Sequence, residues 1–123
     1  MRLLLDTHVL IWWDEGAPVS KGAAAAIREA EQVYVSAVTG WEIAIKASLG
    51  RIETTREVAA AVAESGFEEL PLRLSHAEAL GALPPHHRDP FDRMLAAQAI
   101  SEGLTLVTRN RALSAYEVKV LPA

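Results

Sequence analysis

The chain has 123 residues, of which half are hydrophobic and 23% are charged, so disorder over its whole length is excluded and a single domain spanning residues 1–123 is expected. It contains no cysteine, which excludes a disulfide scaffold, a thiol nucleophile and thiolate zinc sites. Sixteen acidic and twelve basic residues give a net charge of −4, so a broad basic surface for nucleic acid is not expected, although a local patch is compatible with it.

The N-terminal apolar run does not predict a targeting or membrane segment. It is broken by Asp6 and His8 and ends at Asp14, which is too soon for the apolar core of a signal peptide. Nothing approaches the ~20 apolar residues of a membrane span. Together with the missing cysteines, these features predict a cytoplasmic protein without a membrane segment.

Short apolar runs alternate along the chain with helical patterns. Strands are expected at 3–5 and 33–35, with a helix between them that begins after Ser20 and runs to about Glu31. A helix at 41–49, capped by Thr39 or Gly40 and ended by Gly50, follows the second strand. Further along, the pattern predicts helices at 55–64, 75–83 and 90–102 and strands at 67–70, 104–107 and 118–121.

This alternation predicts an α/β fold, in which a parallel sheet carries helices on both faces. In such sheets ligands bind beyond the carboxyl ends of the strands. The polar residues that follow the predicted strands are therefore the candidates for a functional site.

Three carboxylates fall at that edge, and each of them also has a structural explanation at the sequence level. Asp6 follows the first strand, where aspartate is also a favoured helix cap. Glu42 lies near the start of a helix, on one face with Ile45 and Leu49, and can pair with Lys46 four residues on.

The third carboxylate, Asp92, lies beside Asp89 at the start of the helix at 90–102. Asp89 is placed to cap this helix, with Asp92 in its first turn. Asp92 also shares a face with Leu95 and Ala99, an orientation that capping does not require. Acids gathered at one edge repel each other unless a cation or a proton neutralises them, and an all-oxygen set suits Mg²⁺ or Mn²⁺.

Four segments carry a resemblance to a known family. The chain resembles a PIN-domain ribonuclease of the VapC toxin type, which belongs to prokaryotic toxin–antitoxin pairs, and the resemblance covers essentially the whole chain. The segment that starts at His87 is the most specific. The matching segments are Leu-Leu-Asp-Thr-His at 4–8, Val-Ser-Ala-Val-Thr-Gly-Trp-Glu-Ile at 35–43, His-Arg-Asp-Pro-Phe-Asp-Arg-Met-Leu-Ala-Ala-Gln-Ala at 87–99 and Leu-Val-Thr-Arg-Asn at 106–110.

The resemblance implies a three-layer α/β/α fold with a five-stranded parallel sheet and a magnesium-dependent endoribonuclease activity, with manganese as an alternative ion. It implies metal-binding acids at Asp6, Glu42 and Asp92, with Asp89 either a further acid of the site or the cap that orients Asp92. Asn110 stands where similar proteins often carry an aspartate, and an amide is a weaker ligand. A hydroxyl such as that of Thr108 often accompanies the site.

Cations near the ends of these segments are candidates for contact with phosphate. Arg111 is better explained as a solvated surface charge. Core or interface positions are favoured for the tryptophans over base stacking, and exposed loop positions are favoured for His86 and His87. The candidate substrate-binding residues are Lys46, Arg88, Arg93, Thr108, Arg109 and Asn110.

The resemblance also implies a small antitoxin as partner and pairing of two copies as a homodimer. We expect an arginine or lysine of the antitoxin to compete with metal for the acidic site. The apolar segment 9–13 and the segment 79–83 are the candidates for the dimer interface.

Other functions remain open at this stage. A phosphatase of the haloacid type needs a second aspartate where this chain has His8, and a receiver domain needs adjacent acids beside Asp6. A catalytically inactive PIN-like module that binds RNA or protein is the remaining alternative, and Asn110 makes it plausible.

Overall fold

The computed structural model describes residues 1–53 and 56–123, which form a five-stranded sheet with helices around it. In chain order the elements are β1 (Arg2–Leu5), α1 (Thr7–Glu15), α2 (Lys21–Glu29), β2 (Gln32–Ser36), α3 (Ala37–Ser48), α4 (Val58–Glu64), β3 (Glu68–Leu70), α5 (Leu74–Gly81), α6 (Pro90–Glu102), β4 (Thr105–Thr108), the 3-10 helix η1 (Arg111–Ala115) and β5 (Val120–Pro122).

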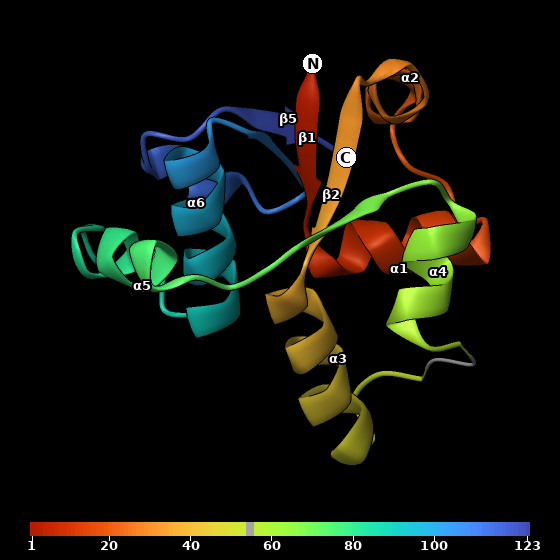
Figure 1. Ribbon diagram of the computed structural model, residues 1–123, viewed down its shortest axis with the longest axis horizontal. Helices are drawn as coiled ribbons and strands as arrows, with labels where there is room; N and C mark the ends of the chain where they lie inside the picture. The colour runs from red at the N-terminus through yellow and green to blue at the C-terminus, as the bar shows by residue number, and fades with distance from the viewer. Residues whose placement is uncertain (54–55) are drawn as a thin grey trace.

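All neighbouring strands pair in parallel, in the order β3-β2-β1-β4-β5. Figure 1 shows α5 and α6 on one side of the sheet and α1, α2 and α4 on the other, while α3 extends beyond the ends of the strands. The chain first adds β2 and β3 on one side of β1, and later adds β4 and β5 on the other side of β1. This arrangement confirms the predicted three-layer α/β/α fold.

The alternation of side chains along β1 divides the core into two halves. Leu3 and Leu5 are fully buried and pack with Val9 and Leu10 of α1 and with α2. Leu4 points to the opposite face and packs against α6. Because both faces of the sheet are covered, the strand consists only of apolar residues where it is paired on both sides.

Two predicted helix starts differ from the structure by three residues or more. α3 begins at Ala37, because the Ser36 hydroxyl accepts the Val38 N–H and caps the helix directly at the end of β2. The start predicted at Trp41 is therefore four residues too late. Of the helix predicted at 55–64, Thr55 lies outside the described residues and the observed helix begins at Val58.

α6 has the predicted bounds because both of its ends are specified locally. Asp89 caps it by accepting the N–H groups of Phe91 and Asp92 at 2.9 and 3.3 Å. Gly103 ends it in the left-handed conformation, with φ of 68°. Within the ranges that the structure describes, no helix is long and apolar enough to cross a membrane.

Candidate active site

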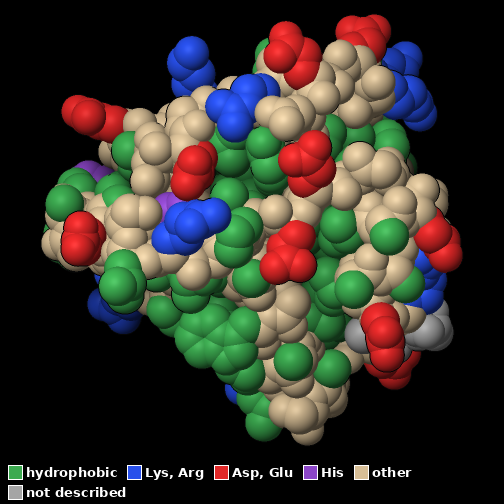
Figure 2. Space-filling view, viewed as in Figure 1, with side chains coloured by type: hydrophobic (Ala, Val, Ile, Leu, Met, Phe, Trp, Pro, Cys, Tyr) green, Lys and Arg blue, Asp and Glu red, His purple; other side chains and the backbone are tan. Residues whose placement is uncertain are grey.

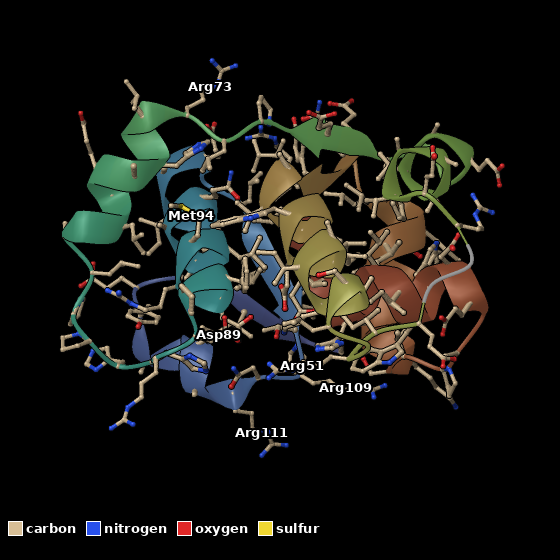
Figure 3. The ribbon with its side chains drawn as sticks, turned by 90° about the horizontal axis from the view of Figure 1, so that it is seen from below. Arg51, Arg73, Asp89, Met94, Arg109 and Arg111 are labelled. Carbon is tan, nitrogen blue, oxygen red and sulfur yellow. The ribbon has the colours of Figure 1, made fainter. Side chains whose placement is uncertain are left out.

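A polar cavity of about 370 Å³ lies at the carboxyl ends of the strands, where β1 separates β2 from β4. Figure 3 views this end of the molecule, with Asp89 and Arg109 labelled. All four predicted acids line the cavity. Its lining residues are Asp6, Thr7, His8, Trp12, Glu42, Lys46, Asp89, Asp92, Arg109 and Asn110.

Asp6 both caps a helix and faces the cavity, so its two sequence-level explanations hold together. One carboxylate oxygen, Oδ1, accepts the Val9 N–H at 3.0 Å and caps α1. The other, Oδ2, accepts a short hydrogen bond from the hydroxyl of Thr108 at the end of β4. The backbone N–H of Asp6 also donates to the Val107 carbonyl, so β4 fixes this side chain from two directions.

Glu42 is only 2% exposed, and its two carboxylate oxygens have different partners. Thr7 donates to Oε1 at 2.6 Å, and the Lys46 ammonium lies 2.5 Å from Oε2. The Thr7 hydroxyl also lies 3.1 Å from that of Thr39, so the acid is tied to α1 as well as to its own helix. The ion pair with Lys46 predicted from the sequence is confirmed.

Asp92 projects from the first turn of α6 and contacts the segment that follows β4. The Asn110 amide donates to Asp92 Oδ2 at 3.1 Å, while Asn110 Oδ1 accepts the Ala112 N–H and caps η1. Asp89, the cap of α6, lines the same cavity. Both roles that the sequence allowed for Asp89 are therefore compatible with its position.

The acids influence one another electrostatically. Burial raises the pKa of Asp6 above its usual range, and the nearby Glu42 carboxylate adds to the rise, while hydrogen bonds from Thr108 and Val9 oppose it. Burial also raises the pKa of Asp92, with further contributions from Asp89 and Asp6. The hydrogen bond to Glu42 raises the pKa of Lys46. Negative charge is thus concentrated in the cavity and only partly compensated.

The donor set of the cavity suits a hard divalent cation, because it consists of carboxylate oxygens with hydroxyl and amide neighbours. In the structure the carboxylates of these acids are not arranged around one common position. Across residues 1–53 and 56–123, no group of three or more histidine or acidic side chains could hold a metal ion as it stands. Both oxygens of Glu42 accept hydrogen bonds here, one from Thr7 and one from Lys46.

The predicted cations separate into two groups. Lys46 and Arg109 line the cavity, whereas Arg88, Arg93 and Arg111 are not among its lining residues. Arg93 instead donates to the Leu83 carbonyl at 3.3 Å, and Figure 3 shows Arg111 pointing outward. Contact of Arg88 and Arg93 with phosphate stays a prediction.

Two histidines have a closer relation to the site than the sequence indicated. His87, expected on an exposed loop, is half-buried: its Nδ1 accepts the Asp89 N–H at 3.0 Å, and its Nε2 lies 3.8 Å from Asp92 Oδ2. His8 lines the cavity although the sequence analysis gave it no role. A role for His8 could have been inferred from its position in the sequence, directly after Asp6 and Thr7.

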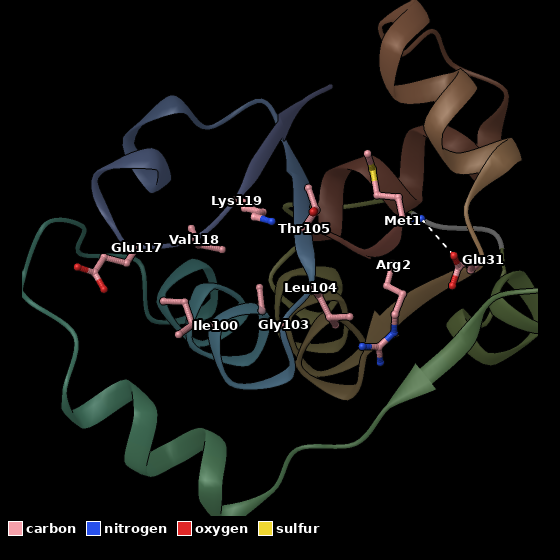
Figure 4. Close-up of a pocket in the computed structure, with 11 residues that line it drawn as sticks. Met1, Arg2, Glu31, Ile100, Gly103, Leu104, Thr105, Glu117, Val118 and Lys119 are labelled. Atoms are coloured by element: carbon pink, nitrogen blue, oxygen red, sulfur yellow. Dashed lines mark ion pairs between the residues drawn. The ribbon is translucent and has the colours of Figure 1, made fainter.

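A larger open groove of about 670 Å³ lies at the opposite, amino ends of the strands (Figure 4). Two of its charged groups already have partners: the Met1 amine lies 3.9 Å from Glu31, and Arg2 donates to the amide oxygen of Gln32 at 3.0 Å. Its two acids, Glu31 and Glu117, form no carboxylate cluster like that of the smaller cavity. Size therefore does not identify the candidate site, whereas the clustered acids do.

Comparison with known proteins gives a consistent result. The family model of the PIN domain matches residues 3–119. The chain is 33% identical over 118 residues to Ribonuclease VapC22 of Mycobacterium tuberculosis (strain ATCC 25618 / H37Rv), covering 93% of this chain and 91% of that protein.

Solved structures with the same fold include two toxin–antitoxin assemblies. VapBC2 from Rickettsia felis, bound to a DNA fragment from its promoter, has a TM-score of 0.73 at 15% identity and covers 99% of this chain and 98% of its own. DNA-bound VapBC from Salmonella typhimurium has a TM-score of 0.73 at 21% identity, with the same coverage. At these identities the likeness concerns the fold.

Proposed function

The chain belongs to the PIN domain family, with a VapC ribonuclease as a relative along nearly its whole length, and we propose that it is a metal-dependent endoribonuclease, the toxin of a type II toxin–antitoxin system. The observation that supports this proposal is the convergence of Asp6, Glu42, Asp89 and Asp92 on one cavity at the carboxyl edge of the sheet. RNA as substrate makes the cytoplasm the expected location.

Asp6, Glu42 and Asp92 would hold the ion, Mg²⁺ or Mn²⁺, which would lower the pKa of a bound water and offset charge that develops on the phosphate. In hydrolysis the water oxygen bonds to phosphorus, one ester P–O bond breaks and the leaving oxygen takes up a proton. The protein contributes fixed positions for the acids, because Thr108 orients Asp6 and Asn110 orients Asp92. Lys46 and Arg109 supply positive charge for the phosphate from the cavity wall.

Asn110 fits an active site as the structure has it. Its amide donates to Asp92, which a carboxylate at this position could not do without a proton. The orienting role needs a donor, and the loss of one negative charge lowers the repulsion within the cavity. We therefore favour the enzyme over the inactive binding module.

The test is cleavage of end-labelled single-stranded RNA, with DNA of the same sequence beside it, in Mg²⁺, in Mn²⁺ and in EDTA. Asp6→Asn and Asp92→Asn should lower the metal-dependent rate about a hundredfold or more. Glu68→Gln is the matched control, because Glu68 is an exposed acid on β3 outside the cavity. RNA binding without cleavage in either metal would favour the inactive module instead.

A small antitoxin is the proposed partner, and the acidic cavity is where a cationic side chain of it would bind. An arginine fork matches carboxylates in pairs, as a divalent ion also does. Antitoxin affinity, measured by calorimetry at constant ionic strength, should then fall as the Mg²⁺ concentration rises. Affinity that is independent of Mg²⁺ would place the antitoxin elsewhere.

Homodimer formation is also proposed, and the exposed apolar residues indicate a surface for it. In the segment 9–13, Val9 and Leu10 belong to the core. Trp41 and Ile45 of α3 and Leu49, its C-cap, are instead exposed, and Figure 2 shows hydrophobic atoms in this lower part of the molecule. Light scattering at micromolar concentration should give twice 13.3 kDa, and Ile45→Glu should shift it toward the monomer.

A further inference from the structure

Three flat side chains are stacked together at the wall of the acidic cavity. The indole of Trp12 lies 5.8 Å from the His8 ring, centroid to centroid, with 25° between their planes. The guanidinium carbon of Arg109 lies 3.9 Å from the centroid of the same indole. All three residues line the cavity that contains the acids.

The stack is held in place by the fold. His8 and Trp12 are four residues apart on α1, so the helix presents them on one face. Arg109 follows β4 directly, and its Nη2 donates to the Pro18 carbonyl at 2.8 Å. The guanidinium is therefore fixed by a hydrogen bond in addition to its contact with the indole.

The outer members of the stack are open to solvent. His8 and Arg109 are exposed, whereas Trp12, which contacts both of them, is half-buried. An imidazole and a guanidinium are both planar groups on which nucleobases stack. The arrangement therefore presents planar surfaces at the mouth of a cavity whose proposed reaction is on a phosphodiester.

We infer that His8, Trp12 and Arg109 form a stacking subsite that holds one unpaired RNA base next to the acidic cavity. This inference rests on the proposed ribonuclease function and identifies which part of the substrate the cavity wall binds. Duplex RNA would not fit it, because the faces of paired bases are covered by their neighbours.

Because the protein has a negative net charge, base stacking should matter for its affinity for RNA. With a net charge of −4, the protein offers no broad basic surface for the RNA backbone, so contact with phosphate is limited to the few cations at the cavity, Lys46 and Arg109. Stacking on an aromatic side chain strengthens binding by about five- to a hundredfold per base and does not depend on positive charge. The base should therefore account for much of the RNA affinity.

The test measures binding separately from cleavage. The full-length protein, carrying Asp92→Asn to prevent cleavage, is titrated at constant salt into fluorescein-labelled octauridylate and into a fully abasic octamer of the same backbone, with anisotropy as the readout. We expect the abasic octamer to bind at least about fivefold more weakly. Equal affinity of the two probes, or no binding of octauridylate, would overturn the inference.

Matched variants then assign the effect to the stack. His8→Ala and Arg109→Lys should each remove most of the difference between the two probes, although Arg109→Lys keeps the charge. His86→Ala and Arg111→Lys are the controls, because both residues are exposed and neither lines the cavity. If Arg109→Lys keeps the full difference between the probes, Arg109 acts only through its charge and the inference fails.

The two proposals can fail independently. Wild-type protein that cleaves RNA but binds both probes equally would retain the ribonuclease and lose the stacking subsite. Protein that distinguishes the probes but cleaves no RNA in either metal would retain the subsite and lose the enzyme.

Discussion

Removing the cation that pairs with the buried Glu42 carboxylate should destabilise the fold although it deletes no core packing. Lys46→Met keeps the length of the side chain and its apolar stem but removes the ammonium that lies 2.5 Å from Glu42 Oε2. The Glu42 side chain is 3% exposed, so its charge would lose its compensating partner in a place that water hardly reaches.

The magnitude follows from where the two groups lie. Breaking a fully buried ion pair costs about 3–5 kcal/mol. Lys46 is 23% exposed on the wall of an open cavity, so the value for this pair should be smaller, about 2 kcal/mol. For a chain of this size that corresponds to a fall in the melting temperature of about 6–10 °C.

The assay is urea unfolding at neutral pH in EDTA, followed by circular dichroism, with the double variant Glu42→Gln/Lys46→Met to complete the cycle. The double variant should be more stable than Lys46→Met alone, because the uncompensated charge is then gone. Lys119→Met, at an exposed lysine, is the control. If Lys46→Met loses no more stability than this control, the pair does not compensate the buried charge and the reasoning is refuted.

Three further outcomes are expected. Gln98→Leu should lower the free energy of unfolding by about 2 kcal/mol in urea, because the buried Ser36 hydroxyl, 2.5 Å from Gln98 Oε1, loses its acceptor. Without metal, the free energy of unfolding should rise as pH falls from neutral toward the ordinary carboxylate range. The reason is that the raised pKa values of Asp6 and Asp92 let the folded state bind protons at higher pH than the unfolded state does. Denaturant titrations at several pH values should show a flatter slope for Asp92→Asn. Gly103→Ala should cost about 1 kcal/mol in thermal unfolding through the φ of 68° alone, because nothing lies within 4 Å of the added methyl.

The sequence predicted those elements whose ends are specified by neighbouring residues. α6 has an aspartate cap, a proline in its first turn and a glycine after its last, so its bounds needed no knowledge of the rest of the fold. α3 offered several capping residues in a row, and the choice of Ser36 depends on where β2 stops pairing with β3. That boundary is set by tertiary contacts and was missed.

The candidate site likewise has a part that the sequence predicted and a part that it did not. The acids were predicted because the carboxyl edge of a parallel sheet gathers whatever follows the strands. The partners that orient them, such as Thr7 for Glu42 and Thr108 for Asp6, come from other elements, and only the assembled sheet brings them within hydrogen-bond distance. His87 likewise reaches Asp92 through the path of the loop before α6, which composition does not specify.

Asp6, Asp89 and Asp92 reach the cavity from the beginnings of helices, and this affects how the site forms. Asp6 caps α1 and Asp89 caps α6, so the partially positive amino ends of two helices face the carboxylates. With Lys46 at Glu42, the protein carries part of the counter-charge itself, and we expect it to fold without a bound ion. Under the proposed metal dependence, a chelator should stop cleavage reversibly without unfolding the protein.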